Sequence, residues 1–202
     1  MTRTDAFLFA IKKVLERQRA FNFVKVGLIG AGNFTSSVML PALKSLRAPV
    51  RVIASRNGLS ATMLAKKYGI PEVTTDVQSV LGNDDVGAVI ITTRHDSHAA
   101  LVKTALEAGK HVFVEKPMAL SVEECEAMIS AANAAQVHLI VGHSHSFNAP
   151  VLETRRIIER GEFGAVRLIN AQYYTDFLYR PRRPEELDST RGGGVVFSQG
   201  AH

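Results

Sequence analysis

The sequence predicts an α/β protein built on a doubly wound parallel sheet, followed by the start of an α+β domain. Three observations carry this prediction. Short apolar segments alternate with amphipathic ones from residue 24 to residue 141. The apolar segments are hydrophobic at nearly every position, which is typical of strands buried on both faces. A Gly-x-Gly turn, Gly30-Ala31-Gly32, directly follows the first of them.

The expected elements follow in order along the chain. Strands are expected at residues 24–29, 50–54, 86–92, 111–115 and 137–141. Helices are expected at residues 34–46, 60–68, 77–81, 97–108 and 122–135. Gly69 and Pro71 end the second helix, and Gly109 ends the fourth. Because parallel strands joined by helices cross over with one hand, this order favours the doubly wound arrangement.

The pattern changes after residue 147. An amphipathic helix is expected at 151–160, and the alternating segment 165–177 predicts an antiparallel strand. A loop rich in arginine and proline follows at 178–194. We therefore expect three regions. These are a leader helix at 1–22, a dinucleotide-binding domain at 23–146, and an incomplete substrate and oligomerisation domain at 147–202.

Composition excludes several classes of protein. The formal charge of +5 is scattered, and no basic stripe with interleaved aromatics suggests a nucleic-acid partner. No segment is long and apolar enough for a membrane span. The single cysteine, Cys125, excludes an internal disulfide and fits a reducing compartment, so a cytoplasmic location is expected. Among His138, His143 and His145, the last two share a face on an extended segment and could both bind zinc. No cysteine or third well-placed ligand accompanies them, so no metal is expected.

The glycine turn predicts a pyrophosphate site at a helix N-terminus. Gly30 permits the tight turn, and Gly32 lets the backbone approach a ligand without a Cβ in the way. The third position of the motif, often glycine, is Thr35. The residues expected to bind the pyrophosphate are Gly30, Ala31, Gly32, Asn33 and Phe34.

The tip of the second strand bears on the choice of dinucleotide. An acidic residue there usually binds the ribose of NAD, but this tip reads Ser55-Arg56-Asn57. Ser55 and Arg56 can donate hydrogen bonds to a 2′-phosphate, which a carboxylate would repel. NADP is therefore favoured over NAD. The alternative is that Arg56 covers the face of the adenine.

Three motifs together resemble the glucose–fructose oxidoreductase and inositol dehydrogenase family (Gfo/Idh/MocA). They are Gly-x-Gly-Asn-Phe, the segment Thr93-Arg94-His95-Asp96-Ser97-His98-Ala99, and Ala108-Gly-Lys-His-Val followed by Glu115-Lys116-Pro117. The resemblance covers residues 24–202 and implies that Lys116 is catalytic. It also implies cofactor contacts at Thr92, Thr93, His98 and Glu115. The alternative is a surface Lys–Glu pair before a proline turn.

A second catalytic signature of that family is a triple glycine, an aspartate four residues on, and a histidine four residues after that. This chain has Gly192-Gly193-Gly194, but Ser198 stands where the aspartate is expected, and His202 falls on the histidine. The resemblance thus implies a dyad of Lys116 and His202. On a helix, positions 198 and 202 share a face, so Ser198 is expected in the substrate cleft.

The segment from Tyr174 to Asp188 resembles a branch of the family that includes phthalate 4,5-cis-dihydrodiol dehydrogenases. Arg180, Arg182 and Arg183 in this segment could bind two neighbouring carboxylates of an aromatic-derived substrate. Alternatively, the acidic residues at 185, 186 and 188 balance these arginines in a solvated loop. His145 is a further candidate for the substrate cleft.

The expected function is hydride transfer between NADP or NAD and a secondary alcohol on a ring, with a phthalate cis-dihydrodiol as candidate substrate. Two alternatives remain open: a sugar or inositol dehydrogenase of the same family, and a non-catalytic dinucleotide sensor. The longer form is expected to be a homo-oligomer. The 202-residue chain alone is expected to bind cofactor without turnover and to be poorly soluble.

Overall fold

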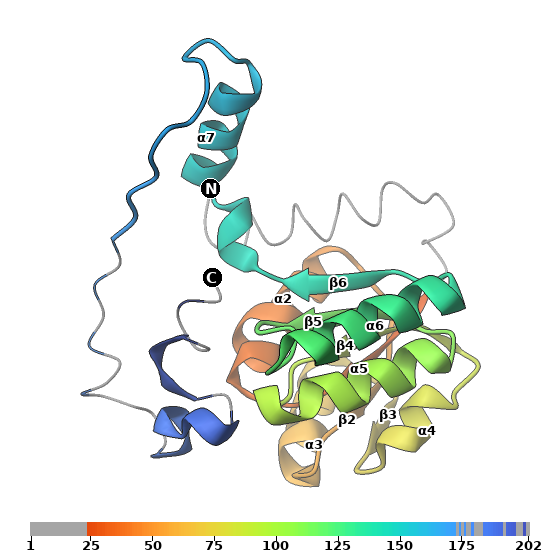
Figure 1. The fold of residues 1–202 in the computed structure, drawn as a ribbon. Coiled ribbons are helices and arrows are strands. Elements are labelled where there is room, and N and C mark those ends of the chain that lie inside the picture. The colour runs from red at the N-terminus through yellow and green to blue at the C-terminus, as the bar shows by residue number, and fades with distance from the viewer. Residues whose placement is uncertain are drawn as a thin grey trace. The chain divides into compact units, whose positions relative to one another are not determined.

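The computed structural model describes residues 24–172, 174, 176, 179, 184–191, 193–196 and 200. The described residues divide into two compact units, with the boundary after Gly142. The first unit is a parallel sheet with helices on both faces (Figure 1). Among the described residues, no helix combines the length and apolar character needed to cross a membrane.

The first unit confirms the predicted doubly wound sheet. Its strands are β1 (Lys25–Ile29), β2 (Val50–Ala54), β3 (Glu72–Thr74), β4 (Val86–Ile91), β5 (His111–Glu115) and β6 (Leu139–Gly142). They are all parallel, in the order β3-β2-β1-β4-β5-β6. Ile29 at the end of β1 pairs with Ala54 of β2 and Ile91 of β4. The carboxyl ends of all six strands therefore meet at one edge of the sheet.

Three helices of this unit, α3, α4 and α6, begin at a residue whose side chain accepts a backbone N–H bond. The elements are η2 (Thr35–Met39), α2 (Leu40–Ser45), α3 (Gly58–Tyr68), α4 (Val77–Leu81), η3 (His95–Ser97), α5 (His98–Glu107) and α6 (Val122–Ala135). Asn57 caps α3, Asp76 caps α4, and Ser121 caps α6. Glu124 reaches back to the backbone N–H of Leu120 at 3.0 Å, which strengthens the start of α6.

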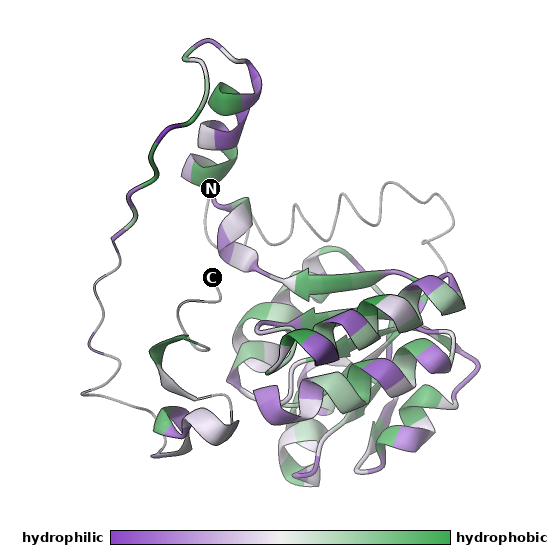
Figure 2. Cartoon of the chain, viewed as in Figure 1, coloured by the Kyte–Doolittle hydropathy of each residue, from purple (hydrophilic) through white to green (hydrophobic). Residues whose placement is uncertain are grey.

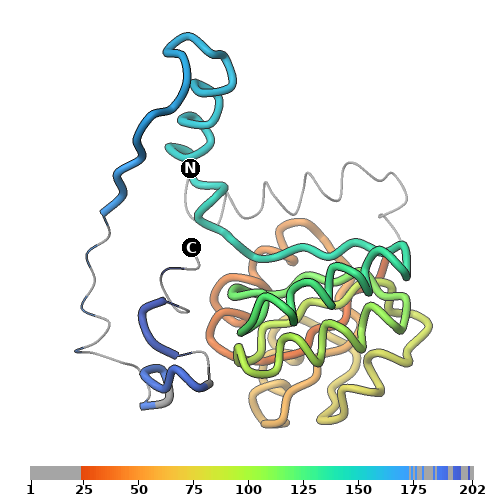
Figure 3. Tube along the Cα trace, viewed as in Figure 1, coloured from red at the N-terminus to blue at the C-terminus, as the bar shows by residue number. Residues whose placement is uncertain are grey.

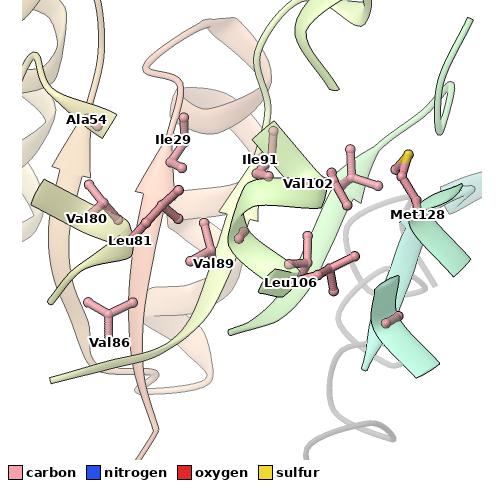
Figure 4. Packing of buried hydrophobic residues seen from close by; sticks show 14 of the residues in the cluster. Ile29, Ala54, Val80, Leu81, Val86, Val89, Ile91, Val102, Leu106 and Met128 are labelled. Atoms are coloured by element: carbon pink, nitrogen blue, oxygen red, sulfur yellow. The ribbon is translucent and has the colours of Figure 1, made fainter. Parts of the chain in front are cut away.

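The main core fills the space between the sheet and the helices α4, α5 and α6 (Figure 4). Val80, Leu106 and Met128 contribute one fully buried side chain from each of these helices. A Cβ on Gly27 of β1 would lie 2.6 Å from Cγ1 of Val80, so glycine at this position lets α4 approach the sheet closely. In Figure 2 the strands are mostly hydrophobic, whereas α5 and α6 carry both kinds of residue.

Three local predictions differ from the structure in this unit. β3, a three-residue edge strand in which Val73 is the one apolar residue, is absent from the predicted strands. β6 begins at Leu139 rather than 137, because the Val137 N–H bonds to the carbonyl of Ala132 and completes the end of α6. The first helix begins with a π-helical turn, where Pro41 lacks the N–H that an α-helical bond to residue 37 would need.

The second unit contains η4 (Ser144–Phe147), α7 (Ala149–Glu159), η5 (Pro184–Leu187) and η6 (Ser189–Arg191). The predicted strand at 165–177 is wrong for the residues that the structure describes there. Residues 165–172 follow an uncoiled path without strand pairing (Figure 3), and Leu168 and Ile169 are 83% and 79% exposed. A strand needs a neighbouring strand to satisfy its backbone, and no described segment pairs with this one.

Candidate cofactor-binding edge of the sheet

The glycine turn after β1 is held against the two neighbouring strands. Gly30 has φ +114°, a conformation that favours glycine, and its N–H donates to the carbonyl of Ala54 at 2.8 Å. A Cβ on Gly30 would lie 2.7 Å from Oγ1 of Thr92 and 3.0 Å from the Thr92 carbonyl oxygen. The turn therefore needs glycine at position 30 because of the chain's own packing.

Thr35 and Thr92 form a hydroxyl pair beneath this turn. Thr35 is fully buried, and its hydroxyl donates to the carbonyl of Gly30 at 2.9 Å. The Oγ1 atoms of Thr35 and Thr92 are 2.6 Å apart. Because the Thr35 proton is committed to Gly30, Thr92 is the donor between the two hydroxyls. Thr35, which the motif alone presents as a departure, thus fixes the turn to β4.

Gly32 has a different reason to be glycine. A Cβ at this position would meet nothing within 4 Å, and its φ lies outside the range that favours glycine. Gly32 and Asn33 are exposed at the start of the helical segment. No described residue requires glycine here, so the missing side chain leaves space above the backbone that the described part of the chain does not fill. A pyrophosphate, which needs close contact with backbone amides, fits this turn.

The tip of β2 presents a hydroxyl and a guanidinium. Arg56 is exposed and Ser55 is half-buried, while the side chain of Asn57 caps α3. The backbone N–H of Ser55 donates to the carbonyl of Thr74, which fixes the tip against β3. Ser55 and Arg56 therefore stay the predicted contacts for the ribose end of a dinucleotide at this tip.

His98, expected to contact the cofactor, lies under the loops after β4 and β5. Its side chain is fully buried, with Nδ1 2.8 Å from the carbonyl oxygen of Pro117 and Nε2 3.3 Å from that of Thr93. Burial lowers the pKa of His98, so the imidazole is neutral at pH 7. Thr93 also accepts a hydrogen bond from the hydroxyl of Ser97 at 2.7 Å. These bonds join the two loops that carry the remaining predicted contacts.

Glu115 and Lys116 lie at the carboxyl end of β5. Glu115 pairs with Gly142 of β6, and both Glu115 and Lys116 are half-buried. The Lys116–Pro117 peptide bond is cis, and Pro117 is buried. Lys116 and the glycine turn thus follow strands at the same edge of the sheet, with β4 between them.

The remaining predicted site residues lie either in the second unit or outside the described residues. His145 lies in the second unit, where its Nδ1 is 3.2 Å from the side-chain nitrogen of Asn148. The predicted catalytic His202 and four predicted substrate contacts lie outside the described residues. Those four are Arg180, Arg182, Arg183 and Ser198.

A doubly wound parallel sheet with a glycine turn after its first strand defines a nucleotide-binding Rossmann fold. A model of the oxidoreductase family with an NAD-binding Rossmann fold matches residues 24–143. The chain belongs to this family, the Gfo/Idh/MocA oxidoreductases. The family resemblance drawn from the three motifs is thereby confirmed.

Individual relatives agree with the family. The chain is 43% identical over 180 residues to 1-carboxy-3-chloro-3,4-dihydroxycyclo hexa-1,5-diene dehydrogenase from Comamonas testosteroni. This match covers 89% of the chain and 45% of the relative. An oxidoreductase domain protein from Kribbella flavida matches with a TM-score of 0.79 and 32% identity, over 88% of this chain and 49% of that one.

A third match comes with a bound dinucleotide. KijD10, a 3-ketoreductase from Actinomadura kijaniata solved in complex with NADP, has a TM-score of 0.63 and 27% identity. The match covers 70% of this chain and 45% of KijD10. The chain spans about half the length of each of these three relatives.

Proposed function

We propose that this chain forms the dinucleotide-binding part of an NADP-dependent dehydrogenase that oxidises a secondary alcohol on a ring. The observation that carries the proposal is the turn at Gly30–Gly32, which is fixed from below and open above, on the edge that also bears Lys116. Open α/β sheets bind their ligands at this edge. The relatives named above, which include a dehydrogenase and a ketoreductase, support the same reaction class.

In this proposal Lys116 and His202 have different roles in the oxidation of the alcohol. The bound dinucleotide supplies the acceptor for the hydride that leaves the carbinol carbon. Lys116 donates a hydrogen bond to the reacting oxygen and stabilises its negative charge as the hydride leaves. His202 accepts the hydroxyl proton, because the pKa of an imidazole lies near neutral pH. Loss of one hydride and one proton converts the alcohol to a ketone.

The choice of NADP rests on the tip of β2. No carboxylate follows this strand in the sequence Ser55-Arg56-Asn57, so nothing there repels a 2′-phosphate. Arg56 can bind that phosphate through two parallel N–H bonds, and Ser55 can donate a third. The NADP bound to KijD10 is consistent with this choice.

The proposed substrate is a carboxylated cis-dihydrodiol. The substrate named for the Comamonas relative carries a carboxyl group and two neighbouring hydroxyls on a cyclohexadiene ring. Arg180, Arg182 and Arg183 are proposed to bind the carboxylate or carboxylates of such a substrate. Oxidation of one carbinol gives a ketone that tautomerises to a catechol, and the gain of aromaticity draws the reaction forward.

Two measurements test this function. Calorimetric titration of the chain with NADPH and NADH should give binding to both, with the dissociation constant for NADPH lower by about tenfold because of a phosphate–arginine pair. Arg56→Ala should remove most of this difference and leave NADH binding unchanged. The absence of heat with either nucleotide would refute the proposal.

The substrate is tested by the absorbance of reduced cofactor at fixed enzyme concentration. Phthalate cis-dihydrodiol should be oxidised by the longer protein, and inositol or a simple sugar should not. Turnover of inositol or sugar alone would assign the protein to the other substrate class. Binding of NADPH with no turnover of any of these alcohols would instead favour a dinucleotide sensor.

A further inference from the structure

His98 is a buried titratable group to which the proposed chemistry gives no role. It is the first residue of α5, and its ring is fully buried between two loops at the carboxyl edge of the sheet. Both ring nitrogens face backbone carbonyl oxygens, that of Pro117 after β5 and that of Thr93 after β4.

The two contacts of the imidazole ring differ in strength, because the neutral ring has a single N–H to donate. A neutral imidazole has one N–H, so it can donate to only one of the two carbonyls. The distance from Nδ1 to the Pro117 oxygen is 2.8 Å, whereas the distance from Nε2 to the Thr93 oxygen is 3.3 Å. The shorter contact is the hydrogen bond, and His98 therefore carries its proton on Nδ1 and donates it to Pro117.

The acceptor of this bond directly follows the proposed catalytic lysine. The Pro117 carbonyl is one peptide unit beyond Lys116, so a bond to that oxygen fixes the backbone from which the lysine side chain extends. The imidazole that makes the bond is itself held by the core, since α5 packs against β4 and β5. Lys116 thereby acquires a rigid support without any contact between the two side chains being required.

We infer that His98 is a positioning residue for Lys116, which it orients through the hydrogen bond to the Pro117 carbonyl. This inference rests on the proposed role of Lys116 at the nicotinamide. It assigns His98 a function different from the direct cofactor contact that the resemblance implies. The ring of His95, 5.8 Å from that of His98 in an edge-to-face arrangement, is a neighbour of the imidazole in the same loop.

Two near-isosteric substitutions separate this role from simple packing. His98→Asn retains an amide N–H near the position of Nδ1 and can still donate to Pro117. His98→Gln places its N–H near the position of Nε2, so it can serve Thr93 but not Pro117. Asparagine is one methylene smaller than glutamine, so a loss of packing alone would affect His98→Asn at least as strongly as His98→Gln, the opposite of the order expected from the hydrogen bond.

The readout is the rate at which an amine reagent such as acetic anhydride modifies Lys116, measured against pH by mass spectrometry of the 202-residue chain. His98→Asn should match the wild-type profile within about twofold. His98→Gln should depart from it by roughly tenfold, because moving a half-buried ammonium group changes its pKa and its access to the reagent. Lys103, an exposed residue of α5, the helix that His98 begins, is the internal control. It should react equally in the wild type and both variants.

Each outcome is decisive. Identical Lys116 profiles in the two variants would overturn the inference. If neither variant folds, nitrogen NMR of wild-type His98 decides, with the Nδ1–H tautomer supporting the inference and the Nε2–H tautomer contradicting it. Protection of wild-type Lys116 by NADPH tests the proposed function separately. Failure of that protection would refute the role of Lys116 while leaving the comparison of the two variants intact.

Discussion

The two units of the chain obtain their structure from different kinds of interaction. In residues 24–142 every strand pairs with a neighbour, and the helices α4, α5 and α6 each bury side chains in a shared core. In the described residues after 142, α7 contains no buried residue and has ion pairs along its own surface, such as Arg155–Glu159 at 2.7 Å. Such surface pairs contribute little.

This difference shows what hydrophobic pattern can and cannot predict. Apolar periodicity predicts an element correctly where the chain itself supplies the surface that buries it. Where that surface is not among the described residues, the same periodicity predicts a strand that the structure lacks, as at 165–172. Side-chain substitutions should therefore have large effects on stability in the first unit and small ones in the second.

The largest contrast is expected between two leucines. Leu106→Ala removes a fully buried side chain from α5 and should lower the free energy of unfolding by roughly 2–5 kcal/mol. Leu168→Ala removes a side chain that is 83% exposed and should change it by less than about 0.5 kcal/mol. Urea unfolding followed by circular dichroism measures both. Equal effects would contradict the division between the units.

The glycine turn should be the next most sensitive feature. Gly30→Ala introduces a Cβ 2.7 Å from Oγ1 of Thr92 in a backbone conformation that favours glycine, and should cost about 3 kcal/mol. Gly32→Ala is the matched control, because its Cβ meets no atom of the chain. We expect Gly32→Ala to keep the stability of the wild type and to weaken NADPH binding. A stable Gly30→Ala protein with normal binding would refute this interpretation of the turn.

A smaller loss is expected from breaking the hydroxyl pair. Thr35→Val keeps the shape of the side chain but removes the 2.9 Å hydrogen bond to the Gly30 carbonyl, which keeps only the longer contact with the Thr92 hydroxyl at 3.4 Å, at a cost of about 1–3 kcal/mol. Thr35→Ser retains the hydroxyl and should lose less stability, with NADPH affinity close to that of the wild type. Denaturant unfolding and NADPH titration of both variants provide the test. Equal losses of stability in Thr35→Ser and Thr35→Val would show that the hydroxyl does not stabilise the turn.

A change of pH should have a mild and directional effect on the first unit. Burial lowers the pKa of His98 and of His111 from the ordinary value of 6.5, so the unfolded chain binds protons that the folded chain does not. Their contribution to stability is complete above pH 6.5 and is lost as the pH falls below it. Unfolding at pH 7.5 and pH 5.5, values chosen to lie about one unit either side, should show lower stability in acid.

A control variant isolates the contribution of His98 to the pH dependence of stability. His98→Asn cannot titrate in this range, so its stability should depend less on pH than that of the wild type. The carboxyl groups of Asp85 and Glu153 have pKa values lowered by their partners Lys25 and Arg156, and they protonate at lower pH. They therefore contribute little to the change between pH 7.5 and pH 5.5. Stability that rises in acid would contradict this account.

Much of the first unit could be predicted from sequence because its signals are local. The bounds of β2 and β5 agree with the predicted strands, since each is a short apolar segment between polar residues. β3 could not be found in this way, because Val73 alone gives no periodicity. Its place in the sheet depends on pairing with β2, which is a tertiary interaction.

The candidate site was predictable as a set of motifs but not as an arrangement. Gly30, Gly32 and Lys116 were found because their neighbours in sequence form patterns. The contacts of Thr35 with Thr92 and of His98 with Pro117 join residues 57 and 19 positions apart, and no local pattern indicates them. A hydroxyl at the third motif position, together with one at the end of β4, is the signal that could have suggested the first contact.

The hydroxyl pair also constrains how this sequence can diverge. Once residue 35 loses its hydroxyl, the hydroxyl of Thr92 loses its 2.6 Å partner and keeps only contacts of 3.4 Å with the carbonyl oxygens of Ile29 and Gly30. A substitution at either position therefore changes which residues the other tolerates. The two substitutions should therefore be non-additive in a double-mutant cycle. Relatives with glycine or alanine at the third motif position are expected to carry a residue other than threonine at the end of the fourth strand.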